Sequence, residues 1–79
     1  MDRFSYEIVE KLGVLSESAN EDFAVEVNRI SYNGQAPKID IRKWDIKANR
    51  MLKGIALSDE EAKELKIILD RVFESEVGK

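Results

Sequence analysis

The fold is decided by residues 52–69, which read LKGIALSDEEAKELKIIL. The first six of these residues form a short apolar segment, in which Ile55 and Leu57 share one face of an extended chain. Ser58 and Glu61 then make a capping box, since the side chain of each can accept a hydrogen bond from the backbone N–H of the other. The stretch therefore predicts a strand that leads directly into a helix.

The predicted helix has an apolar stripe along one side. Its apolar residues recur at three- and four-residue steps, the spacing of an amphipathic helix. They are Ala62, Leu65, Ile68, Leu69, Val72 and Phe73, with Ile67 beside them. We expect this stripe to cover the sheet, a partner helix or both.

Three further extended segments precede this stretch. Residues 4–15 and 23–32 alternate apolar and polar side chains for much of their length, as half-buried strands do. Gly13 is a candidate bend or bulge in the first of them. Residues 33–37 read NGQAP and suit a hairpin turn, because Asn–Gly tolerates the positive backbone angles of a tight turn. The return arm of this hairpin is predicted at 38–44.

The return arm has two distinct faces. Ile39 and Ile41 are predicted to pack inward, and the alternate positions Lys38, Asp40, Arg42 and Trp44 are predicted to be exposed. Residues 45–51 are expected to form a polar, basic loop. Four strands followed by one helix, without alternation of strands and helices, predict an α+β fold. In this fold the helix covers one face of a four-stranded antiparallel sheet.

Length and composition restrict the function further. The chain has 79 residues, 43% of them apolar and 37% charged, which fits one small domain. It contains no Cys and no His, which excludes thiolate or imidazole zinc sites and a Ser-His-Asp triad. No apolar run exceeds three residues, so neither a membrane helix nor a signal peptide is expected and the cytoplasm is the predicted location. A core this small favours a homodimer.

Charge is unevenly distributed along the chain, although the formal net charge is only −3. Residues 1–27 carry two positive and seven negative charges, and residues 58–79 carry four positive and seven negative. Residues 28–57 carry seven positive and two negative charges. The cations of this basic segment are Arg29, Lys38, Arg42, Lys43, Lys47, Arg50 and Lys53. Cations together with Trp44 and Tyr32 on a sheet face are what single-stranded nucleic-acid binding requires.

The chain also resembles a known family. The run KIDIRKWD (38–45), a basic loop and the run MLKGIALSDEEAKELKIIL (51–69) are similar to the single-stranded-DNA-binding domain of the transcriptional coactivator positive cofactor four. The segments YEIVEKLGVLSES and VEVNRISYNGQAPK resemble its bacterial, YdbC-like branch. The resemblance covers nearly the whole chain. It implies a single domain over 1–79, a curved four-stranded antiparallel sheet with a C-terminal helix, a homodimer and a bacterial, nucleoid-associated location.

The resemblance assigns roles to particular residues. Arg42 and Lys53 occupy DNA-contact positions of the family, and Trp44 and Tyr32 are assigned to base stacking. Lys38, Lys43, Lys47 and Arg50 are general candidates for phosphate contact. Two features depart from the family pattern: the second hairpin has Gln35, Ala36 and Pro37 where the eukaryotic domain has lysines, and the eukaryotic tryptophan lies one residue further past the arginine.

Single-stranded DNA binding with little sequence specificity, in transcription, replication or repair, is therefore the predicted function, with RNA as a possible second ligand. No enzymatic activity, cofactor or metal is expected. Three alternatives stay open. The sheet face or the helix stripe could bind an acidic protein partner, Arg42 could simply pair with Asp40 on the surface, and Asp40 with Asp45 could serve a metal-dependent nuclease.

Overall fold

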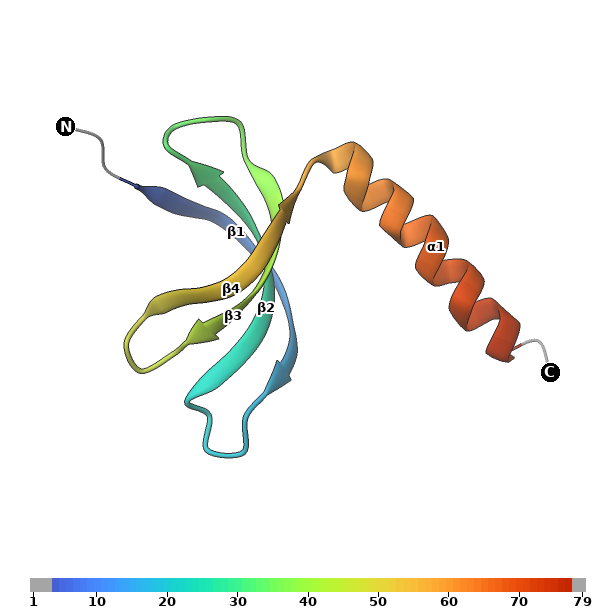
Figure 1. Cartoon of the computed structure of the whole chain (residues 1–79), viewed down its shortest axis with the longest axis horizontal. Coiled ribbons are helices and arrows are strands. Elements are labelled where there is room, and N and C mark those ends of the chain that lie inside the picture. The colour runs from blue at the N-terminus through green and yellow to red at the C-terminus, as the bar shows by residue number, and fades with distance from the viewer. Residues whose placement is uncertain (1–3, 78–79) are drawn as a thin grey trace.

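Four strands and one helix make up the part of the chain that the computed structural model describes, residues 4–77 (Figure 1). They are β1 (Tyr6–Glu17), β2 (Phe23–Tyr32), β3 (Lys38–Asp45), β4 (Arg50–Leu57) and α1 (Asp59–Val77). Each strand pairs antiparallel with the next, so the sheet order is β1-β2-β3-β4. The predicted four-stranded antiparallel sheet with a C-terminal helix is confirmed.

The strand bounds differ from the prediction at β1, which is Tyr6–Glu17 and not 4–15, and at the last hairpin. β4 begins at Arg50 rather than Leu52, because Arg50 pairs with Asp45 and Met51 pairs with Trp44. The connection is therefore a turn over 46–49 and not a long basic loop. Asn49 closes this turn with a φ of 53°, which asparagine tolerates better than most residues.

The capping box forms as predicted and fixes the start of α1. The backbone N–H of Ser58 donates to the Glu61 carboxylate at 2.8 Å, and the backbone N–H of Glu61 donates to the Ser58 hydroxyl at 3.1 Å. Arg29 on β2 holds the same end of the helix through a 3.0 Å ion pair with Asp59. The helix thus leaves the sheet in a defined direction immediately after β4.

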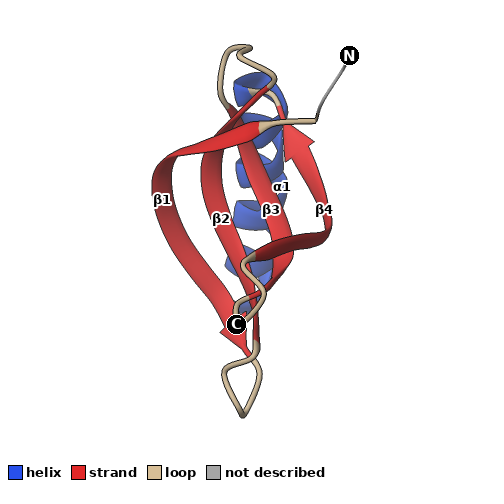
Figure 2. Cartoon of the chain, turned by 90° about the vertical axis from the view of Figure 1, so that its left-hand side faces the viewer, coloured by secondary structure: helices blue, strands red, loops and turns tan. Residues whose placement is uncertain are grey.

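The sheet is strongly curved, with α1 on its convex side (Figures 1 and 2). β1 contains three register shifts against β2, one of them between Lys11 and Gly13, and β4 contains one shift against β3. Extra residues of this kind bend a strand and increase its twist. The bend predicted at Gly13 is therefore observed as an irregularity of the β1 ladder.

Gly54 allows β4 to approach β3 closely. It pairs with Arg42, and a Cβ atom built at position 54 would lie 1.9 Å from the Cβ of Arg42 and 2.6 Å from the carbonyl oxygen of Ile41. Both distances are far shorter than any real contact. Only glycine therefore fits at this position with the present strand spacing.

The buried core lies on one face of the sheet, which we call the concave face. Its buried residues are Ala24, Asn28, Ile30, Asp40 and Trp44. They occupy alternate positions of β2 and β3, and the strand register sets Ala24 opposite Trp44 and Asn28 opposite Asp40. The prediction that Asp40 and Trp44 would be exposed is wrong, whereas Ile39 and Ile41 lie on the face towards α1, as predicted. Curvature closes the concave face over Asp40 and Trp44, whereas Ile39 and Ile41 are only half-buried on the opposite face.

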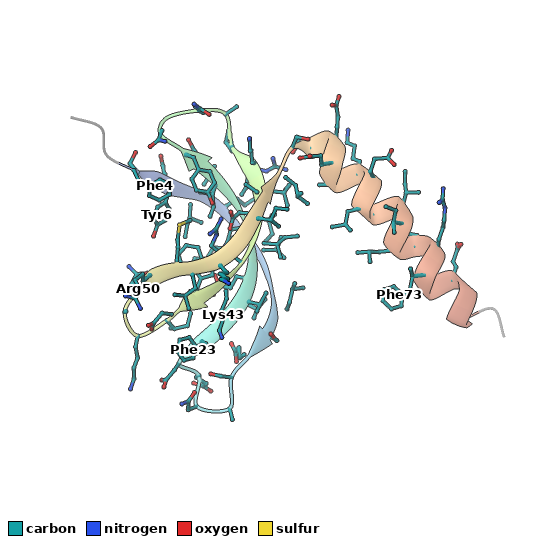
Figure 3. All side chains as sticks on the ribbon, viewed as in Figure 1. Phe4, Tyr6, Phe23, Lys43, Arg50 and Phe73 are labelled. Atoms are coloured by element: carbon teal, nitrogen blue, oxygen red, sulfur yellow. The ribbon has the colours of Figure 1, made fainter. Side chains whose placement is uncertain are left out.

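That opposite face, which we call the back, is incompletely covered. α1 begins against it, and a cavity of about 320 Å³ lies between the helix and the sheet. The cavity is lined mainly by Val27, Ile39, Ile41 and Leu57 of the sheet and by Ala62, Leu65 and Leu69 of the helix. Further along α1 the predicted apolar stripe is exposed, including Ile68 at 51% and Phe73 at 56% (Figure 3).

Candidate nucleic-acid interface

An ion pair between Arg42 and Asp40, which are two residues apart on β3, lies in the centre of the concave face. The Arg42 guanidinium donates from Nε and Nη2 to the two carboxylate oxygens of Asp40, both at 2.7 Å. Asp40 is completely buried and the Arg42 side chain is 15% exposed. The pairing of Arg42 with Asp40 thus exists, but it is a buried bidentate pair and not a surface contact of small energy.

Tyr32 completes this cluster from the end of β2. Its hydroxyl donates to the second carboxylate oxygen of Asp40 and accepts a hydrogen bond from Arg42 Nη2 at 3.1 Å. Burial of the phenol, with the nearby Asp40 carboxylate, raises the pKa of Tyr32 to about 12. The hydrogen bonds to Asp40 likewise raise the pKa of Arg42. Tyr32 therefore stays protonated and Arg42 stays charged over the ordinary pH range, and the hydrogen bonds fix the orientation of all three side chains.

Arg42 retains little capacity for an additional ligand. A guanidinium has five N–H donors. Four are used in the structure, since Nη1 also donates to the carbonyl oxygen of Leu52 at 3.0 Å. One N–H of Arg42 is therefore free to bind a ligand. It lies where the hydrogen bond from Arg42 to Leu52 joins β3 to β4.

Aromatic rings form a connected row across the concave face. The ring centroids of Phe4 and Tyr32 are 5.8 Å apart, those of Phe4 and Tyr6 are 6.0 Å apart, and those of Tyr6 and Trp44 are 5.9 Å apart. Phe4 is 66% exposed and lies with Tyr6 on the hollow side of the sheet (Figure 3). The row therefore presents ring surface to solvent at its Phe4 end.

Sequence reasoning missed Phe4 and Tyr6 as site residues. Both were included in a predicted strand, but only the pairing of β1 with β2 sets Tyr6 directly opposite Tyr32. The sequence does show an aromatic residue in each of the two strands, Tyr6 and Tyr32. To place them together, the register between β1 and β2 would have had to be known.

Trp44 is buried at the other end of the row. Its exposed fraction is 4%, so the prediction that it stands outward beside Arg42 as a stacking platform is wrong for the chain as it stands. Trp44 and Arg42 do share the concave face, but the curvature of the sheet covers Trp44 there. Among the described residues, the indole N–H of Trp44 finds no hydrogen-bond partner.

The predicted lysines are distributed over both faces and the strand ends. Lys38 and Lys53 are exposed, and Lys53 lies in the register shift of β4, one residue before Gly54. Lys43 points to the face opposite Arg42, where its Nζ lies 4.9 Å from the centre of the Phe23 ring. The structure thus groups Arg42 and Tyr32 closely and leaves the lysines as separate exposed cations.

Lys47 and Arg50 lie at the turn between β3 and β4. Lys47 Nζ is 3.7 Å from a carboxylate oxygen of Asp22, and Arg50 Nη2 is 3.6 Å from one of Asp45. Both side chains are mostly exposed, and pairs of this length and exposure contribute little to stability. A phosphate group could therefore compete for either cation.

The residues of the alternative nuclease site are otherwise engaged. Asp40 pairs with Arg42, and Asp45 accepts from the backbone N–H of Ala48 at 3.0 Å besides its contact with Arg50. Within residues 4–77, no three acidic side chains come together in a way that could hold a metal ion. The described helix is also not apolar enough to cross a membrane.

These features define a class of small domains in which a strongly curved antiparallel sheet, with a polar and aromatic concave face, is followed by one helix on its convex side. Comparison with known families agrees with this description: the family model described as "Transcriptional Coactivator p15 (PC4)" matches residues 20–68. The chain belongs to this family, as its sequence predicted. It is also similar to an uncharacterized protein of Treponema pallidum (strain Nichols), with 38% identity over 69 residues that cover 87% of this chain and 80% of that protein.

Proposed function

We propose that this chain binds single-stranded DNA along its concave face and forms a homodimer through its back. Membership of a family of non-catalytic, single-stranded-DNA-binding domains supports the ligand class. The observation that carries the proposal is the row of rings on the concave face, which ends in the exposed Phe4 and is braced by Tyr32. A row of this kind can stack successive bases without reading their identity.

Phosphate contacts would come from the exposed cations around this row. The proposed phosphate ligands are Lys53, Lys38, Lys47 and Arg50. Lys43 would reach a DNA phosphate only where the bound DNA continues past the edge of the sheet. Arg42 has one free donor, so we propose that it acts mainly by positioning Tyr32 and makes at most one phosphate contact. Trp44 supports Tyr6 from beneath and is not itself a platform.

The dimer is proposed from the uncovered back. Among the side chains of α1 that the structure describes, five apolar ones are more than 40% exposed, namely Ile67, Ile68, Leu69, Val72 and Phe73. Leu69 also lines the cavity between α1 and the sheet, together with the half-buried Ile39 and Ile41. A second copy of the chain offers the same apolar surface, and twofold association would remove both from water. Sedimentation equilibrium is expected to give twice the chain mass, and a monomer at micromolar concentration would contradict this part of the proposal.

The DNA proposal is tested by titrating the protein with a labelled oligothymidylate at several salt concentrations. Binding is expected to weaken steeply with salt, because each neutralised phosphate of a single strand contributes about 0.7 to the logarithmic slope. Lys53→Ala is expected to lower that slope by about this amount. The matched control is Lys63→Ala, an exposed lysine on α1, which is expected to leave the slope unchanged.

The outcomes separate this function from the alternative of an acidic protein partner. Such a partner would also give salt-dependent binding, but no stacking on Phe4. Loss of oligothymidylate affinity in Phe4→Ala would support the proposed function, and absence of binding at micromolar concentration would refute it. Parallel titrations with oligouridylate and duplex DNA would establish the preference among nucleic acids.

The cellular role proposed is in transcription, replication or repair in the bacterial cytoplasm, in association with the nucleoid. The bacterial relative with 38% identity supports a bacterial source. Immunofluorescence of the native protein with a DNA stain would test the location.

A further inference from the structure

Two small cavities adjoin on the concave face, along β1. One has a volume of about 220 Å³ and is lined by Trp44, among others. The second has a volume of about 260 Å³ and is lined by Val14 and Asn28, among others. Of the described residues, only Lys11 and Glu26 line both cavities. The two cavities therefore meet at these two side chains and together form a groove.

The register of the sheet places Lys11 on the concave face. Lys11 pairs with Asn28, which is buried on that face. Directly paired residues of neighbouring strands present their side chains to the same side of the sheet. Trp44 belongs both to the row of rings and to the lining of the groove, so the groove adjoins the row. A DNA strand that stacks on the rings can therefore continue along β1 past Lys11.

The ammonium group of Lys11 is available for a ligand. Within residues 4–77, no carboxylate forms an ion pair with it, and the side chain is exposed. Arg42, in contrast, donates four of its five N–H groups inside the chain. Glu26 is half-buried and accepts from the Asn28 side chain at 3.3 Å. Lys11 is therefore the more exposed of the two charges at which the cavities meet.

We propose that Lys11 binds one phosphate group of the DNA strand, with the two nucleotides that this phosphate joins lying in the two cavities. A lysine ammonium has three donors and no acceptor, which suits a phosphate oxygen. Each cavity is smaller than the roughly 300 Å³ at which pockets for drug-sized ligands begin, so each accommodates one base and not several. This inference rests on the proposed function and adds to it the path of the DNA along β1.

The salt dependence of oligothymidylate binding tests the phosphate contact. Lys11→Ala is expected to lower the logarithmic slope by about 0.7, the contribution of one phosphate of a single strand. Lys11→Arg keeps the charge and is expected to preserve the slope. Lys63→Ala on α1 is the control for the loss of one exposed cation. An unchanged slope in Lys11→Ala would overturn the contact.

A second pair of variants tests the path along the groove. Val14 lines the groove and is 54% exposed, whereas Val9 is 50% exposed on the same strand and lines neither cavity. Val14→Glu adds a carboxylate to the groove and is expected to weaken oligothymidylate binding about fivefold, because like charges at contact distance repel even in water. Val9→Glu adds the same charge outside the groove and is expected to leave the affinity unchanged. Thermal denaturation is expected to show both variants folded, since both positions are exposed.

The outcomes distinguish this inference from the function on which it rests. Equal affinities of Val14→Glu and Val9→Glu would overturn the path through the groove, while binding of the wild-type chain to oligothymidylate would still support the proposed function. Failure of the wild-type chain to bind would overturn both.

Discussion

The two faces of the sheet solve the problem of burial differently. The concave face has all five of the buried residues described. Among them is Asp40, whose carboxylate is paired within the chain by Arg42 and Tyr32. The back has the apolar side chains of β3 and α1, yet leaves Ile68 half exposed. One face is thus completed internally, and the other is left incomplete in the isolated chain.

This difference indicates that the concave face is the rigid one and that the back has apolar surface available for contact with another apolar surface. A polar network with every member bonded fixes the orientation of its side chains, since any rearrangement would leave a buried charge unpaired. An exposed apolar stripe has no such internal constraint and is removed from water by whatever packs on it. The comparison can be tested by changing each face separately.

The largest effect on the fold is expected from Asp40→Asn. The change leaves the Arg42 charge buried without its bidentate partner and should lower the free energy of unfolding by about 3 to 5 kcal/mol. Urea denaturation measures it. The matched control Asp70→Asn breaks the exposed ion pair with Lys66 on α1 and should cost less than about 0.5 kcal/mol. Equal effects of the two variants would contradict the account of the concave face.

A smaller but substantial loss is expected from Gly54→Ala. The added methyl group would overlap Arg42 and the backbone of Ile41, so β4 has to move away from β3. Overpacking of this kind should cost about 3 kcal/mol. Gly13→Ala is the control, because a Cβ at position 13 meets nothing within 4 Å. Thermal denaturation measures the two effects. Equal melting temperatures of the two variants would contradict the close approach of β4 to β3 at Gly54.

A pH-dependent effect is expected from Tyr32. The folded chain holds its phenol protonated, with the pKa raised from 10.0 to about 12, so this contribution to stability is complete below pH 10 and is lost as the pH rises towards 12. Tyr32→Phe should cost about 1.5 kcal/mol at neutral pH. The difference in the free energy of unfolding between wild type and Tyr32→Phe should shrink between pH 10 and 12. A constant difference across that window would place the phenol outside the network.

The smallest effect on the isolated chain is expected from Ile68→Glu on the back. Ile68 is already half exposed, so the free energy of unfolding at high dilution should change by no more than about 0.5 kcal/mol. The proposed dimer should be lost, because two carboxylates would be brought into an apolar contact. Sedimentation equilibrium measures this, with Lys63→Glu as the control on the same helix. A dimer that survives Ile68→Glu would assign association to another surface.

The fold followed from local signals in the sequence. The capping box at Ser58 and Glu61, the Asn–Gly turn and the alternation of β2 each depend on residues close in sequence, and each is observed. These signals do not depend on how the strands curve. For this reason the order and type of the elements could be predicted.

The faces of β3 could not be predicted in the same way. Alternation divides Asp40, Arg42 and Trp44 from Ile39 and Ile41, but it does not tell which set is covered. An apolar set normally marks the buried face, and here the curvature of the sheet reverses that expectation by enclosing a charged pair and an indole. Curvature comes from bulges in β1 and from the close approach at Gly54, which are properties of the pairing register.

We propose that single-stranded DNA binds to the concave face and not to the back. Chemical-shift mapping of the backbone amides during titration with an oligothymidylate tests it most directly. We expect the largest shifts at Tyr6, Tyr32 and Lys53, with little change at Ile39 and Leu65. Shifts concentrated along α1 and the back, with the concave face unchanged, would contradict the account.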